Sequence, residues 1–290
     1  MTSGRLRLAG APISWGVCEV PGWGYQLRPD RVLAEMRDVG LSATEFGPDG
    51  FLPSDPARKA NLLGSFGLAA VGGFVPAIMH DSSIDPIPRV DSALDDFVAV
   101  GANVLVLAAV TGRDGYDARA ELDSDAWKVL LASLDRVAAH AARRGVLATL
   151  HPHVGTLVER PHEVSRVLDG SAIQLCLDSG HLLIGGTDPA QLARRVGDRV
   201  AHVHLKDVDA TWAERVRGGE VSYAQAVARG MYRPLGQGDV DIAGLIDALK
   251  AVGYNGWYVL EQDTVLTREP DGEGPVADVR ASVAHLRSLT

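Results

Sequence analysis

Short apolar runs alternate with longer stretches of helical periodicity from one end of the chain to the other. Such runs are typical of buried strands, and apolar residues spaced three and four positions apart are typical of helices that pack on one face. Strands that alternate with helices predict a parallel sheet with helical crossovers. The pattern predicts strands at residues 8–15, 41–46, 68–75, 103–110, 146–152, 173–178, 200–206 and 256–261, and helices near residues 31–39, 56–66, 89–100, 124–144, 162–168, 189–196, 242–252 and 276–289.

Several of the predicted helices end at a glycine that directly precedes the next strand, as at Gly40, Gly67, Gly145 and Gly253. Glycine adopts the left-handed conformation that commonly ends a helix. The units follow one another without a Pro/Gly-rich linker, and no glycine-rich phosphate-binding turn follows the first strand. We therefore expect the α/β class and a single (β/α)8 barrel domain over residues 1–290, rather than an open doubly wound sheet.

One connection departs from this regular pattern. Residues 209–238, after the seventh strand, are far longer than a connection from strand to helix requires. In a barrel, the loops that follow the strands form the face that carries the active site. We expect this segment, called the excursion below, to be a loop insertion over that site.

Composition and charge narrow the class of protein. The net charge of −9 disfavours nucleic acid and anionic membrane surfaces as partners, because both would be repelled. Cys18 and Cys176 follow no metal or redox spacing, and two cysteines suit a reducing compartment. The N-terminus lacks the apolar run of a signal peptide, and no stretch is long and apolar enough to span a bilayer. A cytoplasmic protein with a small neutral ligand is expected.

Side chains that could perform chemistry follow the last strands. Because alternate residues of a strand share a face, His202, His204 and Lys206 should point together into the barrel. Two imidazoles and an ammonium are costly to bury without partners, which favours a site over simple packing. The same alternation brings Asp178 to the end of the sixth strand and Glu261 to the end of the eighth.

The fifth strand adds His151 and His153, which share a face. Carboxylates from two strands and an imidazole from a third, completed by either His151 or His153, make a mixed nitrogen and oxygen site. Such a site suits Mn²⁺, Co²⁺, Fe²⁺, Mg²⁺ or Zn²⁺. Since residues at the C-terminal ends of barrel strands are typically catalytic, we expect one divalent metal there.

Weaker signals concern substrate contact. Glu45 alternates with Leu41 and Ala43 and should project inward at the end of the second strand, where substrate contact is favoured over a structural salt bridge. Trp15 ends the predicted first strand and is expected either as an apolar wall under a sugar ring or as a cap on the core. Arg233 lies in the excursion, where substrate contact and a solvated side chain are both open.

The strand-end residues also resemble a known family. Segments 178–181 and 202–207, followed by Glu261, resemble the xylose-isomerase-like barrel superfamily of sugar isomerases, epimerases and lyases. Within it, the second half of the chain is similar to the inosose dehydratases over residues 151–156, 219–232, 234–241 and 253–263. Many superfamily members carry a Glu at the end of the fifth strand, where this chain has His151.

The resemblance implies a metal-dependent dehydratase that removes water from a keto-inositol such as 2-keto-myo-inositol, with no organic cofactor. Its metal, Mn²⁺ or Co²⁺ in preference to Mg²⁺, Fe²⁺ or Zn²⁺, would be bound by His151, Asp178, His204 and Glu261. His153, or Glu261 if the metal does not engage it fully, would remove a proton beside the ketone, and Lys206 would donate to the enolate or the departing hydroxyl.

Substrate contacts are expected from Trp15, Glu45, His181, Arg233 and Gln262, with a small polyhydroxylated ketone as the partner and a homo-oligomer left open. The main alternative is a sugar isomerase or epimerase, which would use the same metal but return the proton instead of expelling hydroxide. A DNA-repair nuclease on the same barrel is disfavoured by the acidic charge. A non-catalytic sugar-binding barrel is a further alternative.

Overall fold

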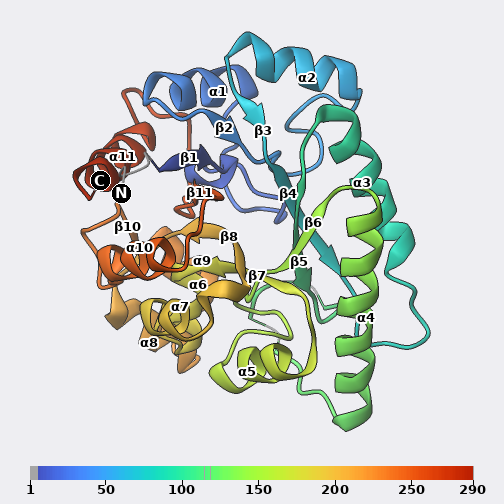
Figure 1. Cartoon of the computed structure of the whole chain (residues 1–290). Coiled ribbons are helices and arrows are strands. Elements are labelled where there is room, and N and C mark those ends of the chain that lie inside the picture. The colour runs from blue at the N-terminus through green and yellow to red at the C-terminus, as the bar shows by residue number, and fades with distance from the viewer. Residues whose placement is uncertain (1–5, 114, 118, 290) are drawn as a thin grey trace.

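The predicted parallel strands form a barrel at the centre of the computed structural model, which describes residues 6–113, 115–117 and 119–289. Helices surround this barrel (Figure 1). Neighbouring strands pair in the order β3-β2-β1-β11-β8-β7-β6-β5-β4. The strands are β1 (Arg7–Gly10), β2 (Ala43–Thr44), β3 (Ala69–Ala70), β4 (Gly72–Ala77), β5 (Val104–Ala109), β6 (Leu147–Leu150), β7 (Gln174–Asp178), β8 (Val200–Leu205) and β11 (Trp257–Leu260).

The barrel closes through its third predicted strand, which is divided at Val71 into β3 and β4. The first part pairs with β2 and the second with β5. Val71 donates its backbone N–H to Thr44 and accepts from Val104, so it bridges the two edges of the sheet. Gly72 has a φ of 154°, and a side chain there would collide with the Val104 carbonyl. Glycine therefore permits the close approach at this junction.

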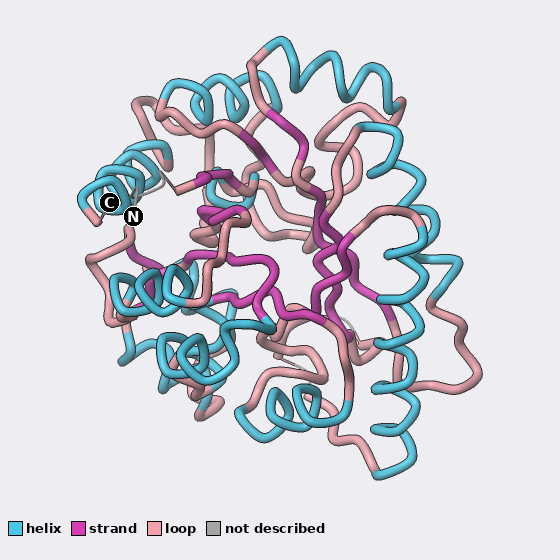
Figure 2. Tube along the Cα trace, viewed as in Figure 1, coloured by secondary structure: helices cyan, strands magenta, loops and turns pink. Residues whose placement is uncertain are grey.

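The eight predicted helices are all present, and each of their ends lies within two residues of the predicted position (Figure 2). Their apolar positions face the barrel, as in α4, where Leu130, Leu134 and Val137 are buried. Gly145 and Gly253 have φ angles of 74° and 77°, as expected for glycines that end helices. The helices are α1 (Pro29–Asp38), α2 (Pro56–Ser65), α3 (Ile87–Val100), α4 (Ser124–Arg143), α5 (Pro161–Gly170), α7 (Pro189–Val196), α10 (Ile242–Ala251) and α11 (Val276–Ser288), with a short α6 (Ser179–Gly185) that the sequence pattern did not predict.

The first strand is shorter than predicted. It ends at Gly10, and Pro12–Trp15 forms a 3-10 helix, η1, instead of continuing the strand. Proline has no N–H for the sheet ladder and a φ suited to the first position of a helical turn. The expectation that Trp15 ends a strand was therefore wrong.

The excursion is not a plain loop, which corrects a second expectation. It contains α8 (Ala210–Arg217), α9 (Tyr223–Ala228) and β10 (Tyr232–Arg233). The strand β10 pairs in antiparallel fashion with β9 (Asp207–Val208), directly after the seventh barrel strand. The Asp207 carboxylate accepts N–H bonds from Gly236, Gly238 and Val240, and so holds the returning chain.

The core has two parts. Large side chains such as Leu105 and Leu107 pack between the barrel and its helices. Small side chains of the strands, including Val106, Cys176 and Val259, form a separate cluster that reaches the histidines described below. No helix among the described residues is long and apolar enough to cross a membrane.

Candidate functional site

The register of neighbouring strands brings three predicted ligands together. Asp178 of β7 pairs with His204 of β8, and His204 pairs on its other side with Val259 of β11, two residues before Glu261. The Nδ1 atom of His204 lies 3.6 Å from Asp178 Oδ2 and forms an ion pair with Glu261 Oε2. Donor atoms of Asp178, His204 and Glu261 all lie within 4.8 Å of one another.

His151, which directly follows β6, contacts one of these carboxylates, whereas His153 does not join them. The Nε2 atom of His151 lies 3.2 Å from Asp178 Oδ2, the oxygen that also faces His204. The other Asp178 oxygen accepts the backbone N–H of His181 and so caps α6. One side chain therefore fixes the start of a helix and presents its free oxygen to two imidazoles.

The donor set of this cluster fits a divalent metal ion. Glu261 Oε2 pairs with His204 Nδ1, whereas His151 Nδ1 is buried and forms no hydrogen bond with the described residues. Buried polar atoms normally find a partner, so an unpartnered imidazole nitrogen among closely spaced carboxylates supports a cation site. Two imidazoles and two carboxylates, one from each of four strand ends, are ligands that Mn²⁺, Co²⁺, Fe²⁺ and Zn²⁺ accept.

Glu45 lies behind this cluster and also lines the pocket described below. Its Oε1 accepts from His202 Nε2 at 2.7 Å and from His204 Nε2 at 2.9 Å. Burial alone would raise the pKa of Glu45, but the charge of His204 and the bond from His202 hold that pKa well below its usual range. Because Nε2 of His204 donates to Glu45, its Nδ1 is directed at Asp178 and Glu261.

Lys206 is wholly buried among carboxylates. Its Nζ lies 2.7 Å from Asp263 Oδ1, 3.0 Å from Glu261 Oε1 and 3.6 Å from Asp178 Oδ2. Burial would lower the pKa of Lys206, but the charges of Asp263, Glu261 and Asp178 raise it well above its usual value. The side chain is thus a cation next to the candidate metal ligands.

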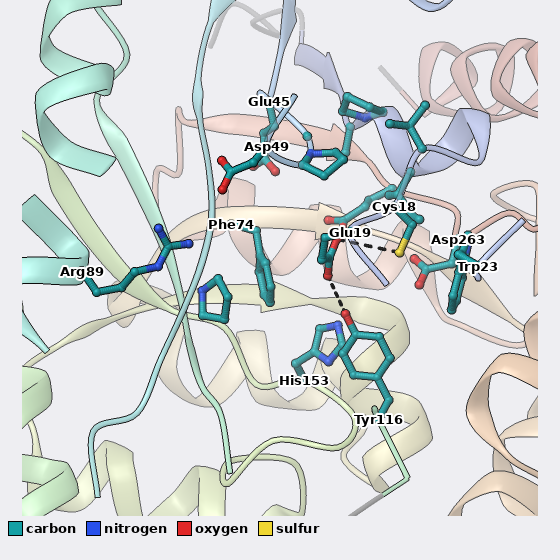
Figure 3. A pocket seen from close by; sticks show the side chains of 18 residues that line it. Cys18, Glu19, Trp23, Glu45, Asp49, Phe74, Arg89, Tyr116, His153 and Asp263 are labelled. Atoms are coloured by element: carbon teal, nitrogen blue, oxygen red, sulfur yellow. Dashed lines mark hydrogen bonds between the residues drawn. The ribbon is translucent and has the colours of Figure 1, made fainter. Parts of the chain in front are cut away.

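A pocket opens beside the cluster (Figure 3). Its ionisable lining includes His153, Glu261 and Asp263 on the side of the cluster. Tyr116 lies next to His153, with ring centroids 4.8 Å apart, and donates a 2.6 Å hydrogen bond to Glu19; both side chains face the cavity in Figure 3. Apolar walls come from the segment after β1 and from β4 itself, namely Pro12, Ile13, Val17 and Trp23 in the first and Phe74 and Pro76 in the second.

Two further histidines, His153 and His181, pack against each other with ring centroids 3.7 Å apart. His153 Nδ1 donates to the Val154 carbonyl at 2.7 Å, which leaves Nε2 as the ring's lone pair. Burial, and then the charge of His151, lower the pKa of His153 to about 3. His181 Nδ1 accepts the Val154 N–H at 3.5 Å, so its Nε2 carries the proton and has no partner among the described residues.

Three predicted substrate contacts lie away from the pocket lining. Trp15 is wholly buried, and its indole N–H donates to Glu35 at 2.7 Å. Arg233 is exposed and pairs with Asp209. The Gln262 side chain donates to Asp278 of α11. The structure brings Glu45 into the pocket lining and His181 beside it, but not these three.

Sequence reasoning missed several side chains of the site. Asp263 continues the alternation of Val259 and Glu261, so the strand pattern contained a signal for it. Tyr223 and Tyr232 are buried and reach the site from the excursion. Their separation in sequence from their partners left no local pattern to find them.

A barrel whose strand ends converge on imidazoles and carboxylates has the arrangement typical of barrel enzymes, and the sequence relatives narrow this class to one family. The family model described as xylose isomerase-like TIM barrel matches residues 33–289. The chain belongs to this family.

Among curated relatives, the inosose dehydratase of Geobacillus kaustophilus (strain HTA426) is 31% identical over 90% of this chain and 89% of its own length. The rhizopine catabolism protein MocC of Rhizobium meliloti is also 31% identical, over 89% of this chain and 82% of its own length. Among solved structures, the IOLI protein with a bound zinc atom superposes with a TM-score of 0.71 at 13% identity, covering 98% of each chain. That last likeness concerns the fold alone.

Proposed function

We propose that this protein is a metal-dependent dehydratase that removes water from a keto-inositol such as 2-keto-myo-inositol. The observation that carries the proposal is the meeting of Asp178, His204 and Glu261 beside Lys206 and an open pocket. Its support from relatives is the 31% identity to an inosose dehydratase over nearly the whole of both chains.

We assign the metal ligands to His151, Asp178, His204 and Glu261, with Mn²⁺ or Co²⁺ as the proposed ion. The contact of His151 with Asp178 supports His151 over His153 as the fourth ligand. A divalent ion held there would supply Lewis acidity at the ketone oxygen, which acidifies the neighbouring C–H.

His153 is proposed as the base that takes this proton. Its Nδ1 is engaged by the Val154 carbonyl, so the lone pair of Nε2 is free, and the residue lines the pocket. A general base must reach the proton that it removes, and a pocket-lining imidazole meets that condition. Glu261 is the alternative base if it is not fully engaged as a ligand.

Lys206 is proposed as the acid. The proton from carbon goes to His153, the C–O bond to the β-hydroxyl breaks, and that hydroxyl leaves as water with a proton from Lys206. The same ammonium stabilises the enolate that precedes this bond cleavage. Its contacts with Glu261 and Asp263, both in the pocket lining, support a position within reach of substrate.

Substrate contacts are proposed at His181 and Glu45. The Nε2–H of His181 is a buried donor without a partner among the described residues, and Glu45 is a pocket-lining acceptor. The apolar walls at Phe74 and Trp23 suit the C–H face of a cyclic polyol.

We further propose one domain over residues 1–290 whose excursion covers the site, since the buried Tyr223 and its ring contact with His181 come from that segment.

The test begins with elemental analysis of the purified protein, followed by a panel of keto-inositols and ketoses. Dehydration would produce a 1,2-diketone in equilibrium with its enol, a conjugated hydroxy-enone with new ultraviolet absorbance, and NMR would identify it. An isomerase or epimerase would convert a ketose without this absorbance. A metal-loaded protein that binds a keto-inositol without turnover would contradict the proposal and indicate a binding protein.

A further inference from the structure

Lys206 has one carboxylate partner that is not a proposed metal ligand, and this partner is tied to the excursion. Asp263 Oδ1 accepts from Lys206 Nζ at 2.7 Å. Asp263 Oδ2 accepts from the hydroxyl of Tyr223, which lies on α9, at 2.6 Å. Since the Tyr223 proton is used in that bond, Tyr232 donates to the Tyr223 oxygen at 2.7 Å. An unbroken chain of hydrogen bonds therefore runs from β10 and α9 to the Lys206 ammonium.

These tyrosines pack inside the site and do not merely cover it. Both are buried, and the Tyr223 ring stacks on His181 at 5.8 Å between ring centroids. The Tyr232 ring lies 5.7 Å from Lys206 Nζ, at its face. A side chain at Gly180 would meet Lys206 Cβ at 2.6 Å and Tyr232 at 3.0 Å, so glycine lets the start of α6 pack closely against both residues.

The ammonium of Lys206 needs such a fixed partner. Lysine carries a compact charge on a flexible stem with freely rotating donors, so its direction is set by the acceptors around it. Asp178 and Glu261 are also proposed metal ligands, so Asp263 is the one carboxylate of these three that is not shared with the metal. Asp263 can hold one orientation because Tyr223 engages its second oxygen.

We propose that Tyr223 is a positioning residue for Lys206, acting through Asp263. The inference rests on the proposed function of Lys206 as the acid of a dehydration. It assigns the excursion a role in catalysis beyond excluding water, because the tyrosine hydroxyl sets the direction in which Lys206 donates.

A double-mutant cycle tests this positioning. Tyr223→Phe, Lys206→Met and the double variant are compared with the parent for kcat and KM on a keto-inositol. Tyr223→Phe should lower kcat by about 10- to 100-fold, the scale of a misplaced catalytic group, with KM within about threefold of the parent. In the Lys206→Met background, Tyr223→Phe should cause no further fall in kcat, since the ammonium that it positions is gone.

The matched control is Tyr254→Phe. Tyr254 donates its hydroxyl to the Trp257 carbonyl at the start of β11, away from the pocket, so the loss of this bond should leave kcat unchanged. Metal content and the midpoint of thermal unfolding are measured for every variant. If Tyr223→Phe does not fold, Asp263→Asn replaces it in the same cycle, because it keeps the shape of the side chain while removing the charge that faces Lys206.

The outcomes separate the two proposals. A parent enzyme without turnover of keto-inositols contradicts the proposed function. An active parent in which Tyr223→Phe leaves kcat unchanged, or lowers it equally with and without Lys206, contradicts the positioning role alone. An effect of Tyr223→Phe that disappears in the Lys206→Met background supports it.

Discussion

The two halves of the barrel contribute different things to the site. The ends of β6, β7, β8 and β11 bring the ionisable cluster, in which His151, Asp178, His204 and Lys206 are buried and Glu261 is half-buried. Strands β1 to β5 and the segments that follow them bring mainly the pocket walls, such as Ile13 and Phe74. The charged side chains are therefore concentrated on the four neighbouring strands β6, β7, β8 and β11, while the other strands determine the shape of the cavity.

The energetics of the halves differ accordingly. A buried charge costs several kcal/mol unless other charges and hydrogen bonds offset the loss of water. In the ionisable half each charge has such partners, so removing one leaves another without its counter-charge. In the apolar half, a substitution changes packing or cavity shape. We therefore expect substitutions in the half formed by β6 to β11 to act on metal binding and kcat. Substitutions in the half formed by β1 to β5 should act on stability or KM.

The largest effect is expected for Asp178→Asn. Asparagine keeps the shape and can still cap α6 by accepting the His181 N–H, so the fold should survive. The lost charge faces His151 and His204, and metal affinity should fall by more than the roughly 10- to 100-fold typical of a residue that only supports a ligand. Elemental analysis and calorimetric titration measure this, and activity should fall in parallel. Full metal occupancy in the variant would remove Asp178 from the ligand set.

The next effect is expected for Lys206→Met, which keeps most of the stem and removes the ammonium. We expect kcat to fall by about 100-fold or more, the range for losing one donor to a developing oxyanion. Metal content and KM should change little, because Lys206 is not a proposed ligand. If kcat stays within about threefold of the parent, Lys206 has no catalytic role and is only a structural partner of Asp263 and Glu261.

Glu45 is the exception to the division between halves, because it follows β2 yet accepts hydrogen bonds from His202 and His204. Glu45→Gln keeps an acceptor oxygen but removes the charge that orients His204. We expect metal affinity to fall by about 10- to 100-fold, as for other residues that hydrogen-bond a ligand. If metal affinity stays unchanged while KM rises, Glu45 acts on the substrate only, and the halves are more separate than the geometry indicates.

Strand alternation was enough to predict much of the site, and the limits of the prediction have physical causes. His202, His204 and Lys206 share a face because a strand alternates, so their common direction can be predicted without knowing the fold. Partners such as Glu45 and His202 are 157 residues apart, and only the closure of the barrel brings them together. The separation explains why Glu45 was expected at the substrate and not behind His204.

The excursion illustrates a second limit. Its unusual length indicated a functional segment, but Tyr223 lies on the short α9, where no periodic pattern stands out. The bond from Tyr223 to Asp263 depends on tertiary packing of the excursion against β11. The length of the excursion was therefore enough to predict that it has a function. The sequence did not predict which of its side chains reach the site.

The smallest kinetic effect is expected for Trp15→Phe, which tests the region where the strand prediction was wrong. Trp15 was expected either as a substrate wall or as a cap on the core, and η1 turns it into the core, where its N–H donates to Glu35. Losing this bond and part of the indole volume should lower the free energy of unfolding by about 1–3 kcal/mol. The effect should appear in urea unfolding, with kcat, KM and metal content unchanged. As a control, Glu35→Gln keeps an acceptor for the indole and should destabilise less. A rise in KM without loss of stability would show that Trp15 contributes to the substrate site and that the pocket wall extends deeper into the half formed by β1 to β5.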